Sequence, residues 1–269
     1  TTQTDLWDLP DRDGIEHVAK AGRMVARQLV EDGYAVVPYD AQVAKWAKAA
    51  AHLGHQVLAM GGEKRHGATW FVGVDALPNA PDGSVTGVPL AGAWLRFVQP
   101  PKTWHRAQLS VIYPGYPRQD PSESDAAHRF RKNRDAAHVD GLLPEGPHKH
   151  RHLREPHGFI AGFPLNDVAA SPLVVWQGSH EMIRRAFQKA FEGDPPEQWG
   201  DRDVTDIEKA TRKAVFAECD RVTVQAKPGE VILLDRHIVH GGAPWGDDPA
   251  SVPRMIAYFR PTVSAADWL

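Results

Sequence analysis

The stretch AAHVDG, residues 136–141, places an imidazole, His138, and a carboxylate, Asp140, two positions apart. Side chains at i and i+2 of an extended segment point to the same face of the strand. Two histidines and one carboxylate form the arrangement that holds non-haem Fe(II) and leaves coordination positions open. Because His-x-Asp triplets are common by chance, the rest of the chain must supply a third ligand, a co-substrate anchor and a scaffold.

Two histidines late in the chain, His237 and His240, are candidates for the third ligand. They are three positions apart, so on an extended strand they face opposite sides and cannot both reach one metal ion. His240 ends an apolar stretch and precedes Gly241-Gly242, which permit close approach of backbone or ligand. We therefore predict His138, Asp140 and His240 as metal ligands and His237 as a structural residue.

Arg254 opens the last predicted strand and is the candidate anchor for a co-substrate. A guanidinium binds a carboxylate through two hydrogen bonds and stays charged when buried, which suits a dicarboxylate ligand. A salt-bridged framework role for Arg254 remains an open alternative. Arg260 shares the strand parity of Arg254, but its place beside Pro261 predicts a surface residue.

The pattern of apolar residues predicts a helical N-terminal flank at about 13–60 and a β-rich barrel at about 70–262. A helical insertion is expected at about 180–218, and residues 116–137 are expected to form a long loop. The chain has no repeats and no low-complexity linker, so residues 1–269 are predicted to form one domain. Strands are predicted at residues 34–38, 70–74, 93–98, 106–113, 159–163, 172–176, 221–226, 230–234 and 254–260, with 159–163 and 172–176 as a pair.

The composition limits the class of protein. A net charge of −3 argues against a general nucleic-acid binder, which is usually basic. No apolar run approaches the roughly 20 residues that span a bilayer. Cys219 is the only cysteine, so an internal disulfide is impossible. We expect a cytoplasmic protein with neither a nucleic-acid nor a membrane partner, whose oligomeric state the sequence leaves open.

Residues 144–157, PEGPHKHRHLREPH, are rich in histidine and basic residues. A metal-binding tract is conceivable, but the charge and the flanking prolines favour a solvated loop carrying His148, His150 and His152. If this loop has a role, attraction of an anionic group of a small-molecule substrate is a better interpretation than metal binding.

Six short motifs, which include the triad residues and Arg254, occur in the order seen in the phytanoyl-CoA dioxygenase-like family of Fe(II)/2-oxoglutarate-dependent oxygenases, and the chain resembles that family. The resemblance runs from about residue 30 to 260, and its individual motifs are short. Three departures are Gln177, where that family commonly has proline, Gly242, where it often has serine, and the spacing from His240 to Arg254, which is longer than usual in that family. The motifs that carry the resemblance are Glu31-to-Pro38, His138-Val139-Asp140, Gly178-Ser179-His180, Pro228-Gly229-Glu230, His240-Gly241-Gly242 and Arg254.

The resemblance implies a mainly β fold with flanking helices, a double-stranded β-helix of the cupin-like jelly-roll type. It implies Fe(II) on the triad of His138, Asp140 and His240. It also implies that Arg254 binds the distal carboxylate of 2-oxoglutarate, with Gln108 as a further co-substrate contact and Tyr113 as the alternative. No catalytic residue is expected beyond the metal site.

The implied reaction uses O2 and converts 2-oxoglutarate to succinate and CO2 while an aliphatic C–H bond of a small molecule is hydroxylated. In related halogenases a small residue takes the place of the carboxylate, so Asp140 favours hydroxylation. Two other interpretations remain open. One is a non-catalytic, metal-binding cupin-like barrel, and the other is a zinc-dependent hydrolase that activates water with the same triad.

Overall fold

The computed structural model describes the backbone of residues 12–269 and the side chains of residues 19–269. The strands are β1 (Tyr34–Val37), β2 (Lys64–Arg65), β3 (Trp70–Phe71), β4 (Gln108–Ile112), β5 (Leu142–Glu145), β6 (His150–Leu153), β7 (Ile160–Pro164), β8 (Leu173–Trp176), β9 (Arg221–Val224), β10 (Val231–Leu234), β11 (His240–Gly242) and β12 (Arg254–Phe259). The helices are α1 (Arg12–Glu31), α2 (Ala41–Ala59), α3 (Asp125–Asn133), α4 (Ser179–Ala190), α5 (Thr205–Glu218) and α6 (Ala265–Trp268), with 3-10 turns η1 (Ala93–Phe97) and η2 (Pro196–Asp201).

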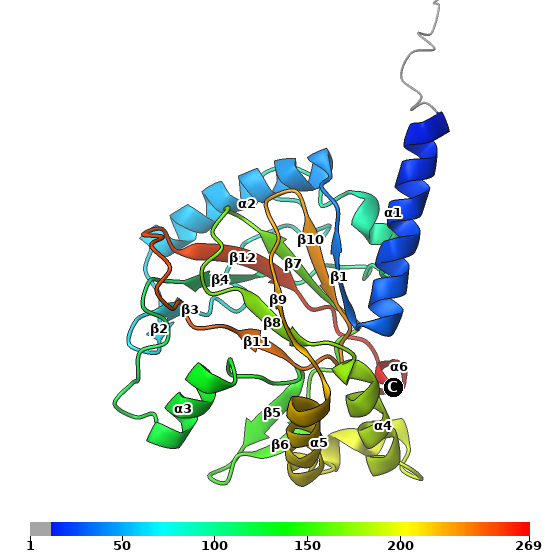
Figure 1. Cartoon of the computed structure of the whole chain (residues 1–269), viewed down its shortest axis with the longest axis vertical. Coiled ribbons are helices and arrows are strands. Elements are labelled where there is room, and N and C mark those ends of the chain that lie inside the picture. Colours follow the sequence, from blue (N-terminus) through cyan, green and yellow to red (C-terminus); the bar gives the residue numbers. More distant parts are fainter. Residues whose placement is uncertain (1–11) are drawn as a thin grey trace, which may run out of the picture.

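Two antiparallel sheets face one another in the body of the protein (Figure 1). The larger has the order β1-β10-β7-β12-β4-β3-β2 and the smaller has the order β11-β8-β9, while β5 and β6 form a separate hairpin. From β7 onward the chain alternates between the two sheets. Strands β7, β10 and β12 lie in the larger sheet, and strands β8, β9 and β11 lie in the smaller one. This alternation is that of a jelly roll, and it confirms the predicted fold class. The strand pairs among the described residues do not close the two sheets into a continuous barrel.

The central strands of the larger sheet, β4, β7, β10 and β12, and the central strand of the smaller sheet, β8, are buried along their whole length, which explains their largely apolar sequences. Between the sheets, Ile160, Ile232 and Ile256 of the larger sheet share a cluster with Leu173 and Val175 of the smaller one. The outer face of the larger sheet is covered by α2, while α4 and α5 lie at one end of the smaller sheet and share an apolar cluster with Val174 and Trp176 of β8 (Figure 1). A rigid sandwich therefore carries the loops at its open end.

The α2 helix is fixed to the larger sheet by Trp46. Its ring centroid lies 5.0 Å from that of Phe163 and 5.8 Å from that of Phe259. Asp40 begins the helix by accepting a hydrogen bond from the backbone N–H of Gln42. No helix in the described part of the chain is both long enough and apolar enough to cross a membrane.

Three local predictions are wrong. Within the predicted strand 93–98, residues 93–97 form η1 instead, a turn that follows Gly92 (φ 129°, a conformation that favours glycine) and buries Trp94. The loop at 116–137 contains α3, which the Ser124 hydroxyl caps by accepting a hydrogen bond from the backbone N–H of Ala127. Segments 159–163 and 172–176 are both strands, but β7 and β8 lie in different sheets and do not pair.

Candidate metal centre and its pocket

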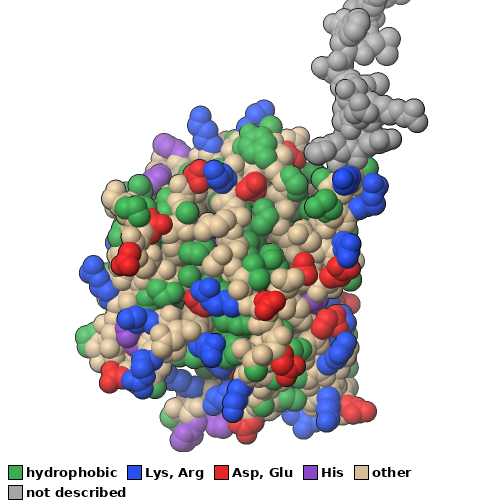
Figure 2. Space-filling view, in the orientation of Figure 1, with side chains coloured by type: hydrophobic (Ala, Val, Ile, Leu, Met, Phe, Trp, Pro, Cys, Tyr) green, Lys and Arg blue, Asp and Glu red, His purple; other side chains and the backbone are tan. Residues whose placement is uncertain are grey.

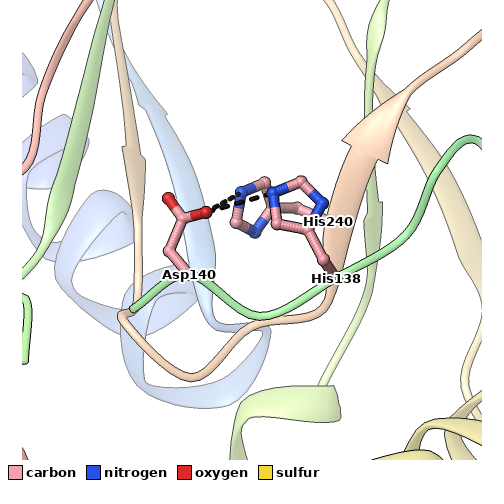
Figure 3. Close-up of side chains that lie close together, drawn as sticks. All are labelled: His138, Asp140 and His240. Carbon is pink, nitrogen blue, oxygen red and sulfur yellow. Dashed lines mark ion pairs between the residues drawn. The ribbon is translucent and has the colours of Figure 1, made fainter. Parts of the chain in front are cut away.

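An isolated β-bridge brings His138 to His240 at the edge of the smaller sheet. The backbone N–H of His138 donates to the carbonyl of His240 at 2.9 Å, and the reverse bond measures 3.0 Å. The bridge sets the two imidazoles side by side, with ring centroids 4.6 Å apart. Asp140, two residues beyond His138, turns its carboxylate toward both rings (Figure 3).

The three side chains converge on one point. Oδ1 of Asp140 lies 3.0 Å from Nε2 of His138 and 3.6 Å from Nε2 of His240. One ligand atom from each residue lies within 4.8 Å of the others, and no other such group of His, Cys, Asp or Glu occurs in the described part of the chain. Two donors that are each about 2.1 Å from a metal ion and at right angles lie about 3 Å apart. The spacing therefore fits a facial metal site.

Backbone contacts fix which nitrogen of each imidazole faces the site. Nδ1–H of His138 donates to the carbonyl of Ala136 at 2.9 Å, and Nδ1–H of His240 donates to that of Ile238 at 3.0 Å. Each bond leaves the Nε2 lone pair directed at the site, as in metal-ligating histidines. Burial lowers the pKa of His240 to about 4, so this imidazole is neutral near pH 7.

The carboxylate of Asp140 is held in its charged form. Burial alone would raise its pKa, but Arg260 and the two imidazoles outweigh burial and hold the pKa well below its usual range. Nε of Arg260 lies 2.7 Å from Oδ2, although its N–H is not directed as in a hydrogen bond. The prediction that Arg260 is a surface residue is wrong: its side chain is 25% exposed and lines the same pocket as the triad. The even spacing between Arg254 and Arg260, which places both on one face of the strand, correctly indicated that Arg260 faces the cavity.

The segment before His138 has an unusual backbone. Asp135 (φ 54°) and Ala136 (φ 52°) are both left-handed, a conformation that non-glycine residues adopt rarely. Arg221 holds the buried carboxylate of Asp135 through two hydrogen bonds of 2.7 Å. The backbone oxygen of Asp135 lies against Gly241, where a Cβ would approach it to 2.1 Å. The turn and the glycine together fix the entry to the metal site.

A cavity of about 640 Å³ opens from the triad into the space between the sheets. Its wall includes alternate residues of β4 and β12, among them Gln108, Ser110, Arg254 and Tyr258. Arg254 is only 7% exposed, and among the described residues its guanidinium has neither an ion pair nor a hydrogen bond. This cavity is within the range of about 300–1,000 Å³ that is typical of small-molecule sites.

The two candidate co-substrate contacts on or beside β4 differ in position. Gln108 lines the cavity; its Nε2 donates to the carbonyl of Val72 at 2.8 Å, and its buried Oε1 has no partner among the described residues. Tyr113 does not line this cavity, and its ring lies 4.3 Å from Nζ of Lys64. Of the two candidates, only Gln108 lines the cavity.

The remaining histidines of interest lie elsewhere. His237 is buried against Trp268, with ring centroids 4.6 Å apart. The segment predicted as a solvated loop forms the β5–β6 hairpin, in which His150 pairs with Asp203 and His152 with Glu145. These hairpin histidines do not line the cavity.

Some pocket residues were not predicted from the sequence. Ser110 and Tyr258 share the strand faces of Gln108 and Arg254, so the period-two alternation could have identified them. Arg151 of β6 and Arg212 of α5 also line the cavity. They come together at the carboxylate of Glu208 only through tertiary packing. No local pattern in the sequence indicates that meeting.

No family model matches the sequence. No curated protein matches it either. Among solved structures, the chain is similar to the non-heme alpha ketoglutarate dependent carbocyclase SnoK from nogalamycin biosynthesis, with 17% identity over 88% of this chain and 83% of that one and a TM-score of 0.49. It is also similar to EctD from S. alaskensis with bound Fe (18% identity, 96% and 78% covered, TM-score 0.45). A third is the non-heme alpha ketoglutarate dependent epimerase SnoN (16% identity, 90% and 82% covered, TM-score 0.47). With identities below 20% and TM-scores below 0.5, these similarities do not indicate a function, so the function is inferred from the geometry of the site.

Proposed function

We propose that this protein is an Fe(II)- and 2-oxoglutarate-dependent dioxygenase that hydroxylates an aliphatic C–H bond of a small molecule. One observation carries the proposal: the two-histidine, one-carboxylate group opens into a cavity that also holds Arg254, a buried arginine without an ion pair among the described residues. A metal site and a carboxylate anchor in one cavity are what this chemistry requires.

The triad fits Fe(II) by the chemistry of its donors. His138 and His240 offer neutral Nε2 atoms whose opposite nitrogens are occupied by backbone carbonyls. Asp140 offers Oδ1, while its Oδ2 is paired with Arg260. Three protein ligands on one side leave coordination positions open toward the cavity.

Arg254 would bind the distal carboxylate of 2-oxoglutarate, with Gln108 as a further contact. A buried guanidinium without a counter-charge is costly, so a bound carboxylate would complete this part of the cavity. When bound, Fe(II) and 2-oxoglutarate supply the oxidising chemistry, in which O2 is consumed and succinate and CO2 are formed. The protein's task is to orient both molecules and to exclude water, for which the apolar cluster between the sheets is suited.

The two rival functions need the triad but not the anchor. A zinc hydrolase or a non-catalytic barrel has no requirement for an unpaired arginine in the metal cavity. The presence of Asp140 also favours hydroxylation over halogenation, because the carboxylate occupies the position that chloride would need. We also propose a cytoplasmic site of action. With Cys219 as its single cysteine, the chain forms no internal disulfide, as is usual for proteins of a reducing compartment.

The test is a succinate-release screen with Fe(II), 2-oxoglutarate and ascorbate across candidate small metabolites. We expect at least one compound to stimulate succinate formation above the rate without acceptor. Asp140→Ala and His240→Ala should both abolish turnover, while His52→Ala, at an exposed histidine of α2, should retain it. Full activity in either triad variant would contradict the proposal.

A further inference from the structure

The cavity wall beside the metal site carries more positive charge than its neighbours neutralise. Among the described residues, the arginines that line it are Arg65, Arg131, Arg151, Arg212, Arg254 and Arg260. Figure 2 shows Lys and Arg side chains gathered around the hollow between α3 and the β5–β6 hairpin. Arg65, Arg131 and Arg260 each pair with a carboxylate, and Arg254 has no ion pair among the described residues. Arg151 and Arg212 share one carboxylate.

The shared carboxylate is that of Glu208 on α5. Its Oε1 lies 3.0 Å from Nε of Arg212 and its Oε2 lies 3.5 Å from Nε of Arg151. The Glu208 side chain is 1% exposed, so solvent does little to compensate these charges. Two guanidinium groups around one buried carboxylate leave an excess of one positive charge facing the cavity. Of the other carboxylates in the wall, Asp140 pairs with Arg260. Glu155 lies 3.6 Å from His157, whose pKa burial lowers, and its half-exposed side chain is compensated by solvent.

This pair of arginines lies directly beside the metal ligands. Nη1 of Arg212 donates to the carbonyl of Ala137 at 2.7 Å, and Nη1 of Arg151 donates to that of Leu142 at 3.4 Å. The two guanidinium groups therefore bracket the segment that carries His138 and Asp140. An anion bound to both guanidinium groups on their cavity side would hold the rest of its molecule close to the triad.

The position of Arg151 is fixed by backbone contacts to the start of α5. Its N–H donates to the hydroxyl of Thr205 at 2.7 Å, and its carbonyl accepts from the N–H of Val204 at 2.9 Å. Apolar residues of the same cavity wall, Phe130 and Leu143, lie beside this basic region. The wall therefore matches a molecule with one anionic end and an apolar body.

We propose that Arg151 and Arg212 form a subsite for an oxyanion group, a carboxylate or a phosphate, of the acceptor substrate. This inference deepens the proposed function and rests on it only for the identity of the molecule that carries the anion. The subsite is separate from the predicted co-substrate anchor, because Arg254 belongs to β12 of the larger sheet.

Inorganic sulfate is a suitable probe, because it binds without turnover. Titration calorimetry on the full chain should give a sulfate Kd that rises at least tenfold in Arg151→Gln and in Arg212→Gln. Glu208→Gln should lower the Kd, because it removes the only shared counter-charge, whereas a purely structural Glu208 would not strengthen binding. Arg184→Gln is the matched control, since Arg184 pairs with Glu181 on α4 outside the cavity and should bind sulfate as the wild type does.

The variants also separate the two anion sites. Sulfate binding that is lost in Arg254→Gln but retained in Arg151→Gln would overturn the subsite, as would the absence of sulfate binding by the wild type. If Arg212→Gln fails to fold by circular dichroism, Arg151→Gln decides the question. A chain that binds sulfate as expected but never consumes 2-oxoglutarate would contradict the proposed function and support the subsite. A chain that consumes 2-oxoglutarate with the same sulfate Kd in Arg151→Gln and wild type would contradict the subsite alone.

Discussion

Arg260 lies 2.7 Å from Oδ2 of Asp140, while Oδ1 of the same carboxylate faces both imidazoles of the triad. The two oxygens thus have different partners, and only Oδ1 is left for a metal ion. Arg260 directly follows β12, so it ties the carboxylate to the larger sheet, whereas the two histidines meet at the edge of the smaller one. The site spans the two sheets through this ion pair.

Arg260→Ala should weaken metal binding. Without the guanidinium, Asp140 loses the partner that orients it and keeps it charged, and changes of this kind cost about 10–100-fold in metal affinity. Calorimetric titration with Mn(II) measures the effect, with Arg184→Ala as a control arginine outside the cavity. An unchanged Kd in Arg260→Ala would show that the ion pair has no part in the metal site.

Gly241 and Gly242 provide a matched pair of substitutions. A Cβ at Gly241 would lie 2.1 Å from the backbone oxygen of Asp135, whereas a Cβ at Gly242 would meet nothing closer than Ile112 at 3.9 Å. Gly241→Ala should therefore lower the free energy of unfolding by about 2 kcal/mol or more, and Gly242→Ala should change it by less than about 0.5 kcal/mol. Urea denaturation of both variants gives the comparison, and equal stabilities would contradict the close contact.

Arg221→Ala should destabilise the turn before His138. The substitution leaves the buried Asp135 carboxylate without its two hydrogen bonds. Because the Arg221 side chain is 43% exposed, water replaces part of the loss, and we expect about 2 kcal/mol. Arg27→Ala breaks a pair exposed at both ends and should cost less than about 0.5 kcal/mol by the same urea assay. A cost no larger in Arg221→Ala than in Arg27→Ala would count against this role.

The stability of the protein should fall in mild acid partly through His237. Burial lowers the pKa of this imidazole, although Asp235 opposes the shift. Since the folded state binds the proton less readily than the unfolded chain, His237 reduces stability as the pH falls below about 6.5. The loss of unfolding free energy between pH 7.5 and 5.5 should be smaller in His237→Gln than in the wild type. An identical loss in both would contradict this assignment.

The sequence was sufficient to predict most strands, from their apolar runs, and the three residues of the triad, from their spacing and neighbouring residues. Period two placed His138 and Asp140 on one face and preferred His240 to His237. The same rule put Arg260 on the face of Arg254, yet its place beside Pro261 suggested a surface residue. Only the tertiary structure shows that the carboxylate of Asp140 lies beside the guanidinium of Arg260.

Other features depend on contacts that no local pattern contains. The α3 helix has no buried residue, so the sequence lacks the apolar stripe that identifies helices. The apolar run at residues 93–98 has a strand-like composition, but it turns to insert Trp94 into the core. Strands β7 and β8 follow one another and were expected to pair, whereas the jelly roll sends them to opposite sheets. The meeting of Arg151 and Arg212 at Glu208 likewise joins β6 to α5.

The most direct test of the central claim is anaerobic titration of the protein with Fe(II) and 2-oxoglutarate, followed by visible absorption. We expect a weak charge-transfer band in the wild type that is absent in His240→Ala and Asp140→Ala. Arg254→Gln should need at least tenfold more 2-oxoglutarate to reach the same intensity. No band in the wild type at saturating concentrations, or a full band in either triad variant, would contradict the account.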